Sequence, residues 1–253
     1  MPSRRRAGNM PKILSLLPDA LICVDETEAD DYAVCGDRLL LHPPMTGLPR
    51  IRNWIHDNVD AGYIVHLDDD FKRVVAQVSV MGNKRTIKDA GEISILIENA
   101  VQTLIDLGST AYCWNRSNNS TIGRPELDSF GFARTPLGSA FVVKNTEMRW
   151  DESLIYRADV DYHMRVLLED RHVIVDKRFY FDVGGIFSGA GGNAGIVPDE
   201  RRDEDKRRLL AKWAPHLNFE ALSIGRKKGA TGQKARSDGM RIKLSRKNHA
   251  AES

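Results

Sequence analysis

The hydrophobic residues of the chain fall into short runs that stop abruptly at polar residues. Runs of three to five apolar residues bounded in this way are typical of buried strands. We expect strands at residues 20–24, 39–41, 63–67, 111–114 and 139–143. The segments between several of these runs are long enough for helices, so the pattern predicts an α/β fold.

Two of the intervening segments have apolar residues at helical spacing. The first begins at Pro49, a residue that suits the first helical turn, and we expect this helix to be closed by Gly62. The second covers roughly residues 88–107 and stops at Gly108. The resulting order of strand, strand, helix and strand is typical of the nucleotide-binding half of a doubly wound sheet.

The strand expected at residues 63–67 is followed by three consecutive carboxylates, Asp68, Asp69 and Asp70. Acids in this position lie at the carboxyl end of a sheet, where open α/β folds bind their ligands. Three adjacent anions repel one another, and a hard divalent cation such as Mg²⁺ or Mn²⁺ relieves that repulsion. The triplet therefore indicates a site for a metal ion and a phosphorylated substrate. A solvated acidic turn is the structural alternative.

A second pair of acids, Asp159 and Asp161, stands at the start of another predicted helix. Asp159 is placed to cap free backbone N–H groups and to complement the helix dipole. Asp161 projects to another side of the helix and is not needed as the cap. A carboxylate at that position beside a metal site would deprotonate an acceptor hydroxyl.

Taken in order, five segments resemble the landmarks of GT-A glycosyltransferases. They are residues 52–55, 63–70, 149–154, 158–161 and 179–181. Within that superfamily the pattern is most similar to the TET-associated glycosyltransferases of bacteriophages, which attach sugars to hydroxymethylated pyrimidines in DNA. The resemblance covers about residues 11–190. It implies a single GT-A-like α/β domain with a Rossmann-like nucleotide-sugar-binding half and a mixed central sheet.

The resemblance also implies roles for individual residues on the donor side. Asp25 would lie beside the uracil or ribose, and Arg50 and Asn53 would flank the nucleotide. Asp68 would face the ribose with Asp69 next to it in the donor site. The implied donor is a UDP-linked sugar such as UDP-glucose or UDP-N-acetylglucosamine.

The implied metal ion is Mn²⁺ or Mg²⁺, held by Asp70 and Asp68. Many relatives supply a histidine ligand after the closing strand, but this chain has no histidine between residues 173 and 215. Asp182 is the nearest substitute for it. Asp161 matches the position usually assigned to the catalytic base of inverting members, with Asp159 beside it as the second catalytic candidate.

The charge of the chain is unevenly distributed. The formal net charge is +2, yet residues 221–253 alone carry +7, which leaves −5 for the rest. Glycines interrupt any regular period in this basic segment, so we expect a flexible tail that binds a polyanion, with nucleic acid as the partner. A solubilising terminus is the alternative. We therefore divide the chain into a flexible basic N-terminus (1–10), a GT-A-like domain (11–220) and a basic tail (221–253).

The chain has no apolar run long enough to cross a membrane, and its start lacks the apolar segment of a secretory signal. Together with the resemblance, this predicts a protein of the cytoplasm of an infected bacterial host, acting on 5-hydroxymethylcytosine in phage DNA without a membrane partner. The glycine-rich residues 184–195 form a candidate lid or an inert linker. The sequence leaves the oligomeric state, the sugar and the anomeric outcome open.

Other function classes remain compatible with the same residues. A GT-A enzyme with a carbohydrate or small-molecule acceptor would keep the Asp triplet. A metal-dependent nucleotidyltransferase or nuclease also needs clustered aspartates and a basic tail. A nucleic-acid-binding module without catalysis would use these acids only structurally.

Overall fold

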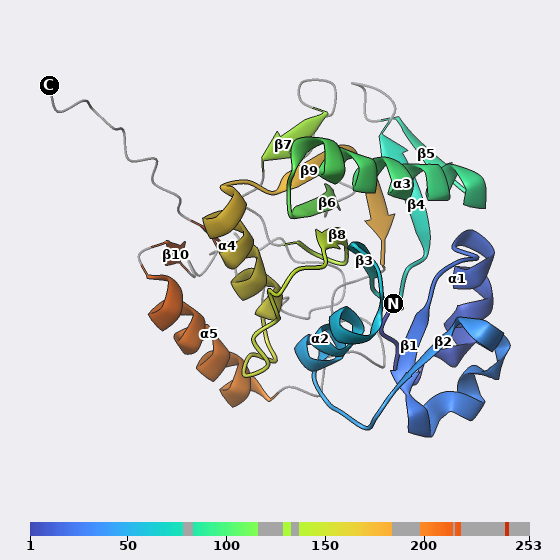
Figure 1. Ribbon diagram of the computed structural model, residues 1–253, viewed down its shortest axis with the longest axis horizontal. Helices are drawn as coiled ribbons and strands as arrows, with labels where there is room; N and C mark the ends of the chain where they lie inside the picture. The colour runs from blue at the N-terminus through green and yellow to red at the C-terminus, as the bar shows by residue number, and fades with distance from the viewer. Residues whose placement is uncertain are drawn as a thin grey trace, which may run out of the picture.

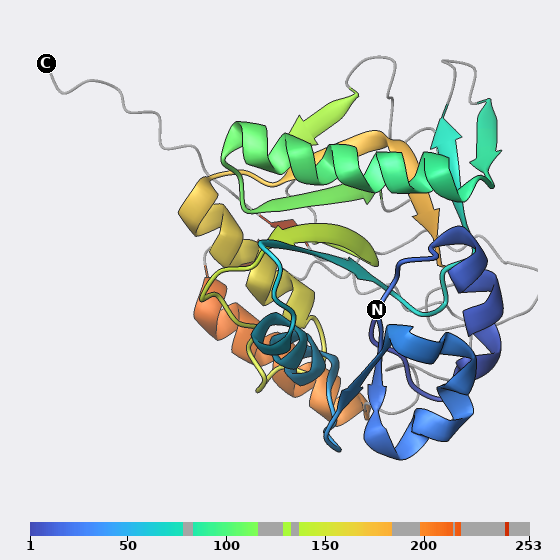
Figure 2. The same cartoon turned by 45° about the vertical axis from the view of Figure 1, so that its right-hand side comes forward.

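The computed structural model describes residues 1–77, 83–115, 129–132, 137–183, 198–214, 216–218 and 241–242. Helices cover both faces of a central sheet in this part of the chain (Figures 1 and 2). The helical elements are η1 (Ala7–Asn9), α1 (Met10–Leu16), η2 (Glu26–Arg38), α2 (Leu48–Asn58), α3 (Ala90–Leu107), α4 (Ala158–Asp170) and α5 (Asp199–Trp213). The strands are β1 (Ile22–Asp25), β2 (Leu39–His42), β3 (Tyr63–Leu67), β4 (Arg73–Gln77), β5 (Lys84–Ile87), β6 (Ala111–Asn115), β7 (Phe130–Phe132), β8 (Ala140–Lys144), β9 (Ile174–Asp182), β10 (Leu217–Asn218) and β11 (Arg241–Ile242).

The central sheet has seven strands in the order β3-β8-β6-β9-β4-β5, with β7 also paired to β9. Only β6 and β9 run parallel within it, and the other pairs are antiparallel. The predicted α/β fold with a mixed central sheet is thus confirmed. The doubly wound first half is not: β1 and β2 form a separate parallel pair, and β3 pairs with β8 instead of joining them.

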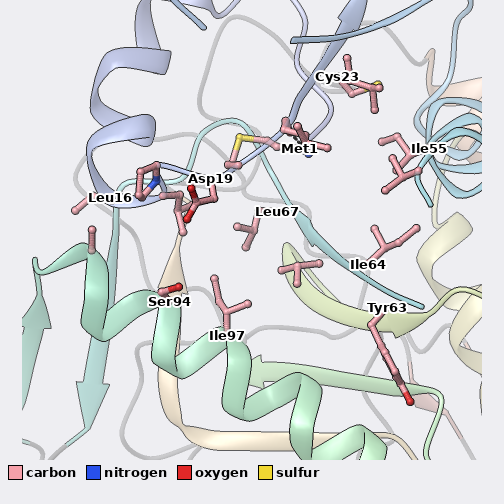
Figure 3. A pocket seen from close by; sticks show the side chains of 18 residues that line it. Met1, Leu16, Asp19, Cys23, Ile55, Tyr63, Ile64, Leu67, Ser94 and Ile97 are labelled. Atoms are coloured by element: carbon pink, nitrogen blue, oxygen red, sulfur yellow. Dashed lines mark hydrogen bonds between the residues drawn. The ribbon is translucent and has the colours of Figure 1, made fainter. Parts of the chain in front are cut away.

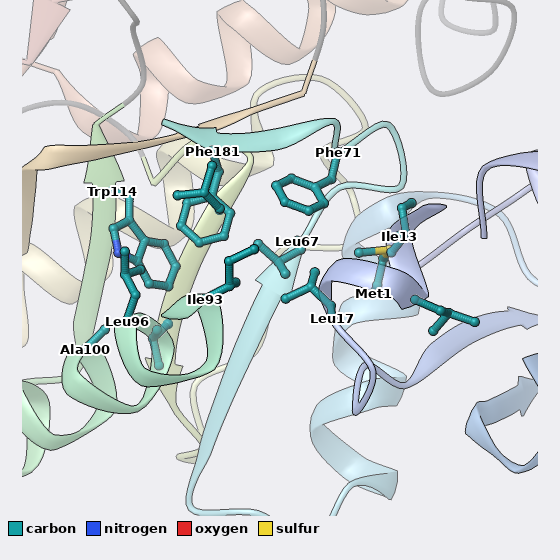
Figure 4. Packing of buried hydrophobic residues seen from close by; sticks show 14 of the residues in the cluster. Met1, Ile13, Leu17, Leu67, Phe71, Ile93, Leu96, Ala100, Trp114 and Phe181 are labelled. Atoms are coloured by element: carbon teal, nitrogen blue, oxygen red, sulfur yellow. The ribbon is translucent and has the colours of Figure 1, made fainter. Parts of the chain in front are cut away.

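The two faces of the sheet build two separate apolar clusters. Side chains of successive strand residues point to opposite faces, so Tyr112 and Trp114 of β6 pack with α3, while Cys113 packs with α4 and α5. Figure 4 shows the first cluster, in which Trp114 and Phe181 meet with ring centroids 4.4 Å apart. This arrangement fixes α4 and α5 on the same face of the sheet.

Most strand and helix predictions are confirmed, with shifts at the ends. α3 ends at Gly108, whose φ of 62° places it in the left-handed region that favours glycine. α2 ends at Asn58, four residues before the expected Gly62, because Val59 already has an extended backbone. α4 begins after Arg157, so Asp159 lies inside the first turn and is not the capping residue that its position suggested.

Residues 1–10 do not form the flexible arm that we expected. Pro2 bridges to Cys23 of β1, and the Ser3 amide donates to the Cys23 carbonyl at 2.8 Å. The side chains of Met1 and Met10 are buried in the first apolar cluster, and Figure 4 shows Met1 there. The arginines of this segment suggested a solvated terminus, but apolar neighbours on both sides dock it onto the domain.

Two further expectations concern segments that are described in part or not at all. The glycine-rich residues 184–195 lie outside the described residues. In the basic segment 221–253 only β11 is described, and it pairs antiparallel with β10. None of the helices described here has the length and apolar character needed to cross a membrane.

Candidate active site

Arg52 links two of the predicted acids that are 91 positions apart in the sequence. Its Nη2 lies 3.7 Å from Oδ1 of Asp68, at the end of β3. Asp159, in the first turn of α4, also interacts electrostatically with this guanidinium. Burial lowers the pKa of Arg52, and the charges of Asp68 and Asp159 oppose that shift. The fold therefore joins the end of the Asp-triplet strand to the acidic helix start through one buried cation.

Aromatic rings hold Arg52 in place. The guanidinium carbon lies 5.0 Å from the ring centroid of Phe141 and 4.5 Å from that of Trp150, within the range of a cation–π interaction. Asn53 fixes Trp150 in turn, since it accepts from the Trp150 amide at 2.6 Å and donates to the Trp150 carbonyl at 3.0 Å. Arg52 is only 5% exposed, so its charge is directed at the two acids rather than at bulk solvent.

The protonation of Asp68 is shifted by this environment. Burial raises its pKa to about 6, while Arg52 and a hydrogen bond with the Ser139 side chain act in the opposite direction. The Asp68 amide also donates to the Ser139 carbonyl at 3.0 Å. A nearby cationic ligand would stabilise the ionised form of such a carboxylate. A raised pKa of this kind is expected at a metal or substrate site.

Asp69 and Asp70 face the N-terminal segment and share its Arg6. Nη1 of Arg6 donates to Oδ1 of Asp69 and lies 3.5 Å from Oδ2 of Asp70. Ser3 adds a hydrogen bond from its hydroxyl to Oδ2 of Asp69 at 2.9 Å, and Asn9 donates to the Asp69 carbonyl at 3.1 Å. Asp69 is therefore fully engaged in docking the N-terminal segment.

The carboxylates fit a divalent ion only in part. Oδ1 of Asp70 is buried and has no hydrogen-bond partner among the described residues. A bound cation would satisfy this oxygen. Asp182 instead binds Nε of Arg73 at 2.9 Å. No three His, Cys, Asp or Glu side chains in the described part of the chain are grouped as a metal site. Asp70 and Asp68 would thus hold a metal with oxygens of the substrate completing its shell, as is usual for Mg²⁺.

Asp161 lies away from this constellation. Its side chain is fully buried, accepts from the Trp213 indole at 2.9 Å, and lies 2.7 Å from Nζ of Lys212 and 3.1 Å from Nε of Arg165. These contacts tie α4 to α5. They leave no access for an acceptor hydroxyl, so the geometry does not fit the base role expected for Asp161.

The remaining predicted donor residues contact protein groups. Arg50 lies 3.1 Å from Glu152, and Asn53 donates to the same carboxylate at 2.9 Å, so both face the segment before α4. Asp25 accepts from the amide and hydroxyl of Thr27 at 3.0 and 2.6 Å, and these bonds lower its pKa. Asp25 lies on the separate β1–β2 pair, apart from the central sheet.

Arg52 and Arg6 are the site residues that sequence reasoning missed. Arg52 belongs to the helix whose apolar face the periodicity identified, and it stands four positions before His56, which is also buried. Two buried polar residues at this spacing on an amphipathic helix are a usable signal. Arg6 offers none, since three consecutive arginines at a chain end are typical of a solvated segment.

A buried histidine pair lies under the site. Nε2 of His56 lies 3.1 Å from Nε2 of His66, so one ring must donate and the other accept, and Nδ1 of His56 lies 3.1 Å from the Asn145 side-chain oxygen. Burial lowers the pKa of His56 to about 4 and that of His66 well below its ordinary value. Both rings are therefore neutral at pH 7.

Acid should destabilise the protein through this pair. Between pH 6.5 and about 4 the unfolded chain binds a proton at His56 that the folded chain excludes, so the free energy of unfolding falls as the pH falls. Between pH 7.5 and pH 5, we expect the free energy of unfolding of His56→Gln to fall by about 2 kcal/mol less than that of the parent, as measured in urea titrations. The raised pKa of Asp68 acts with the opposite sign but is common to both proteins. Parallel pH profiles would contradict the assignment.

A cavity of about 270 Å³ lies between β1 and β3 (Figure 3). Apolar side chains such as Met1, Cys23, Ile64 and Leu67 form most of its wall, and among the described residues that line it Asp19 alone has a charged side chain. This lining does not suit a nucleotide diphosphate. We therefore place the candidate active site at Arg52 and the Asp triplet rather than in this cavity.

No protein-family profile and no curated protein matches the chain. Several solved structures are similar to it, and three of them illustrate the likeness. A mycobacterial protein shares 14% identity, with 95% of this chain and 81% of that chain covered and a TM-score of 0.48. TarS residues 1–349 from S. aureus share 11% identity over 88% and 73% of the two chains, with a TM-score of 0.47.

The third is glucosyl-3-phosphoglycerate synthase from Mycobacterium tuberculosis in complex with phosphoglyceric acid. It shares 11% identity over 95% of this chain and 87% of that chain, with a TM-score of 0.49. Because all three TM-scores lie below 0.5, the function has to be argued from the site itself.

Proposed function

We propose that the chain is a GT-A-type glycosyltransferase that uses a divalent metal ion and a nucleotide sugar. One observation carries the proposal: buried Arg52 forms an ion pair with Asp68 at the end of β3, and the charge of Asp159 at the start of α4 also acts on its guanidinium. Glycosyl transfer needs a group for the donor diphosphate and a group for the acceptor hydroxyl. The two acids at one buried cation supply a candidate for each.

In the proposed reaction Asp159 accepts the proton of the acceptor hydroxyl. The oxygen of that hydroxyl forms a bond to the anomeric carbon of the sugar at the same time. The bond between that carbon and the diphosphate oxygen breaks, and its electron pair leaves with the nucleoside diphosphate. This displacement inverts the anomeric centre. Mn²⁺ or Mg²⁺, when bound, would neutralise the diphosphate charge, with Asp70 and Asp68 as the protein ligands.

The donor in this proposal is UDP-linked, with UDP-glucose and UDP-N-acetylglucosamine as the first candidates. Asp25 is kept as the contact to the uracil or ribose. Arg50, Asn53, Asp69 and Asp182 are already engaged with protein partners, so we give them supporting roles. The family resemblance supports the choice of nucleotide.

The proposed acceptor is 5-hydroxymethylcytosine in phage DNA. The net charge of +7 in residues 221–253 supports a polyanionic acceptor, and the family resemblance supports this base. The rival enzymes are a GT-A transferase with a non-DNA acceptor and a metal-dependent nucleotidyltransferase or nuclease.

A donor panel tests the proposal. Hydroxymethylated DNA would be incubated with the full chain, Mn²⁺ or Mg²⁺, and each of several UDP- and other nucleotide-linked sugars, and its nucleosides then analysed by mass spectrometry. We expect one donor to add the mass of its own glycosyl group, a hexose from UDP-glucose or an N-acetylhexosamine from UDP-N-acetylglucosamine, together with metal-dependent UDP release. UDP release without DNA modification would move the acceptor to another class, and cleavage of plain DNA would favour the nuclease.

The basic tail gives a separate prediction. Deleting residues 225–253 removes all nine Lys and Arg of the tail. We expect a higher KM for long hydroxymethylated DNA and a flatter salt dependence, because each lost phosphate contact lowers the log–log salt slope by about 0.9. Transfer to a mononucleotide acceptor should not change.

A matched variant separates the effect of removing positive charge from the effect of removing β11. Replacing Lys227, Lys228, Lys234 and Arg236 by Gln leaves Arg241 and Ile242 in place. This variant should show part of the same salt effect. Unchanged KM across a salt series for both proteins would remove the tail as the DNA anchor.

A further inference from the structure

The Asp triplet already holds a cation supplied by the chain itself. Arg6 contacts both Asp69 and Asp70, and its side chain is only 14% exposed. Its guanidinium therefore neutralises part of the negative charge that a divalent ion would otherwise meet. This contact joins residues that are more than sixty positions apart, so the fold has brought Arg6 to the triplet.

The N-terminal segment is built to keep Arg6 there. The Arg6 amide donates to the Tyr32 hydroxyl at 2.9 Å, and the same hydroxyl lies 2.8 Å from the Ser3 hydroxyl. Tyr32 is fully buried. Arg5, which precedes Arg6, has a φ of 55°, a left-handed backbone that is unfavourable for a residue with a Cβ. Contacts around Arg6 must offset that cost.

The two carboxylate oxygens of Asp70 have different surroundings. Oδ2 lies 3.5 Å from Arg6, while Oδ1 is buried without a hydrogen-bond partner in the described part of the chain. A single long ion pair satisfies this carboxylate incompletely. A divalent ion at Oδ1 would be attracted by Asp70 and repelled by the guanidinium at Oδ2.

We propose that Arg6 is a resident counter-cation of the Asp triplet that weakens divalent metal binding until a nucleoside diphosphate arrives. The diphosphate adds negative charge and oxygen ligands, so it both completes the metal shell and gives Arg6 a new anion to contact. The metal and the nucleotide then bind cooperatively. This inference rests on the proposed function and names the residue that links its two ligands.

The direct test measures Mn²⁺ affinity rather than turnover. Mn²⁺ would be titrated into the full chain with and without UDP, and the free ion followed by electron paramagnetic resonance. We expect weak binding without UDP and at least about tenfold tighter binding with saturating UDP, equal to about 1.4 kcal/mol of coupling. Arg6→Gln should tighten binding without UDP and shrink the coupling.

Two further variants serve as controls for the effect of charge. Arg4→Gln removes the same charge from the same segment, but the Arg4 side chain contacts Glu28, so its Mn²⁺ affinity should match the parent. Arg6→Lys keeps a cation and should keep the UDP coupling. Thermal unfolding of each variant shows whether the domain is folded.

The outcomes separate this inference from the proposed function. Tight Mn²⁺ binding by the parent chain without UDP would overturn the role of Arg6 even if no variant folds. Equal affinities for the parent and a folded Arg6→Gln variant would overturn it as well. If the parent binds Mn²⁺ neither alone nor with UDP, the metal dependence of the proposed function fails instead.

Discussion

Replacing Asp159 by Asn is expected to lower kcat by about 10²–10⁴ while leaving the affinity for the nucleotide donor nearly unchanged. Asn has the same shape but cannot accept the proton of the acceptor hydroxyl. Asp159 lies inside the first turn of α4 and makes no capping hydrogen bond there, so the substitution should preserve the helix. Single-turnover transfer and donor titration at several pH values would measure the two effects separately.

Asp161→Asn is the matched control for this prediction. The two residues stand on the same helical turn and lose the same charge, but Asp161 contacts Trp213 and Lys212 of α5. We expect the free energy of unfolding to fall by about 1–3 kcal/mol, which lowers the melting temperature. The kcat should stay within a few-fold of the parent value. A large loss of kcat for Asp161→Asn beside a near-normal Asp159→Asn would return the base to Asp161.

The different positions of these two acids show where sequence reasoning ended. The spacing placed both in the first turn of a helix, which the structure confirms. Which one faces the site depends on α5, because Trp213 and Lys212 occupy the side of α4 that Asp161 presents. A contact between helices that are more than fifty residues apart leaves no periodic trace in either segment, so the sequence pointed to Asp161 instead.

Local signals succeeded where local physics decides the outcome. Gly108 ends α3 because a left-handed residue is needed there, and the apolar run before the Asp triplet forms β3. Sheet order was not accessible in this way. The strand pairs β1–β2 and β3–β8 depend on contacts that the order of elements along the chain does not specify. The docking of Arg6 at Asp69 is long-range as well, so the arginines were read only as a charged terminus.

The second large effect is expected for Asp70. Asp70→Ala should abolish metal-supported transfer and the strengthening of UDP binding by Mn²⁺, since it removes the carboxylate whose Oδ1 is buried without a partner in the described residues. The fold should persist, because the side chain is 36% exposed and makes one long ion pair with Arg6. UDP affinity would be measured by calorimetry with Mn²⁺ and with chelator. Asp60→Ala removes one charge from an exposed position nearby in the sequence and should behave like the parent. If Asp70→Ala keeps the Mn²⁺ effect on UDP affinity, the metal lies elsewhere, and the Asp triplet serves only to dock the N-terminal segment.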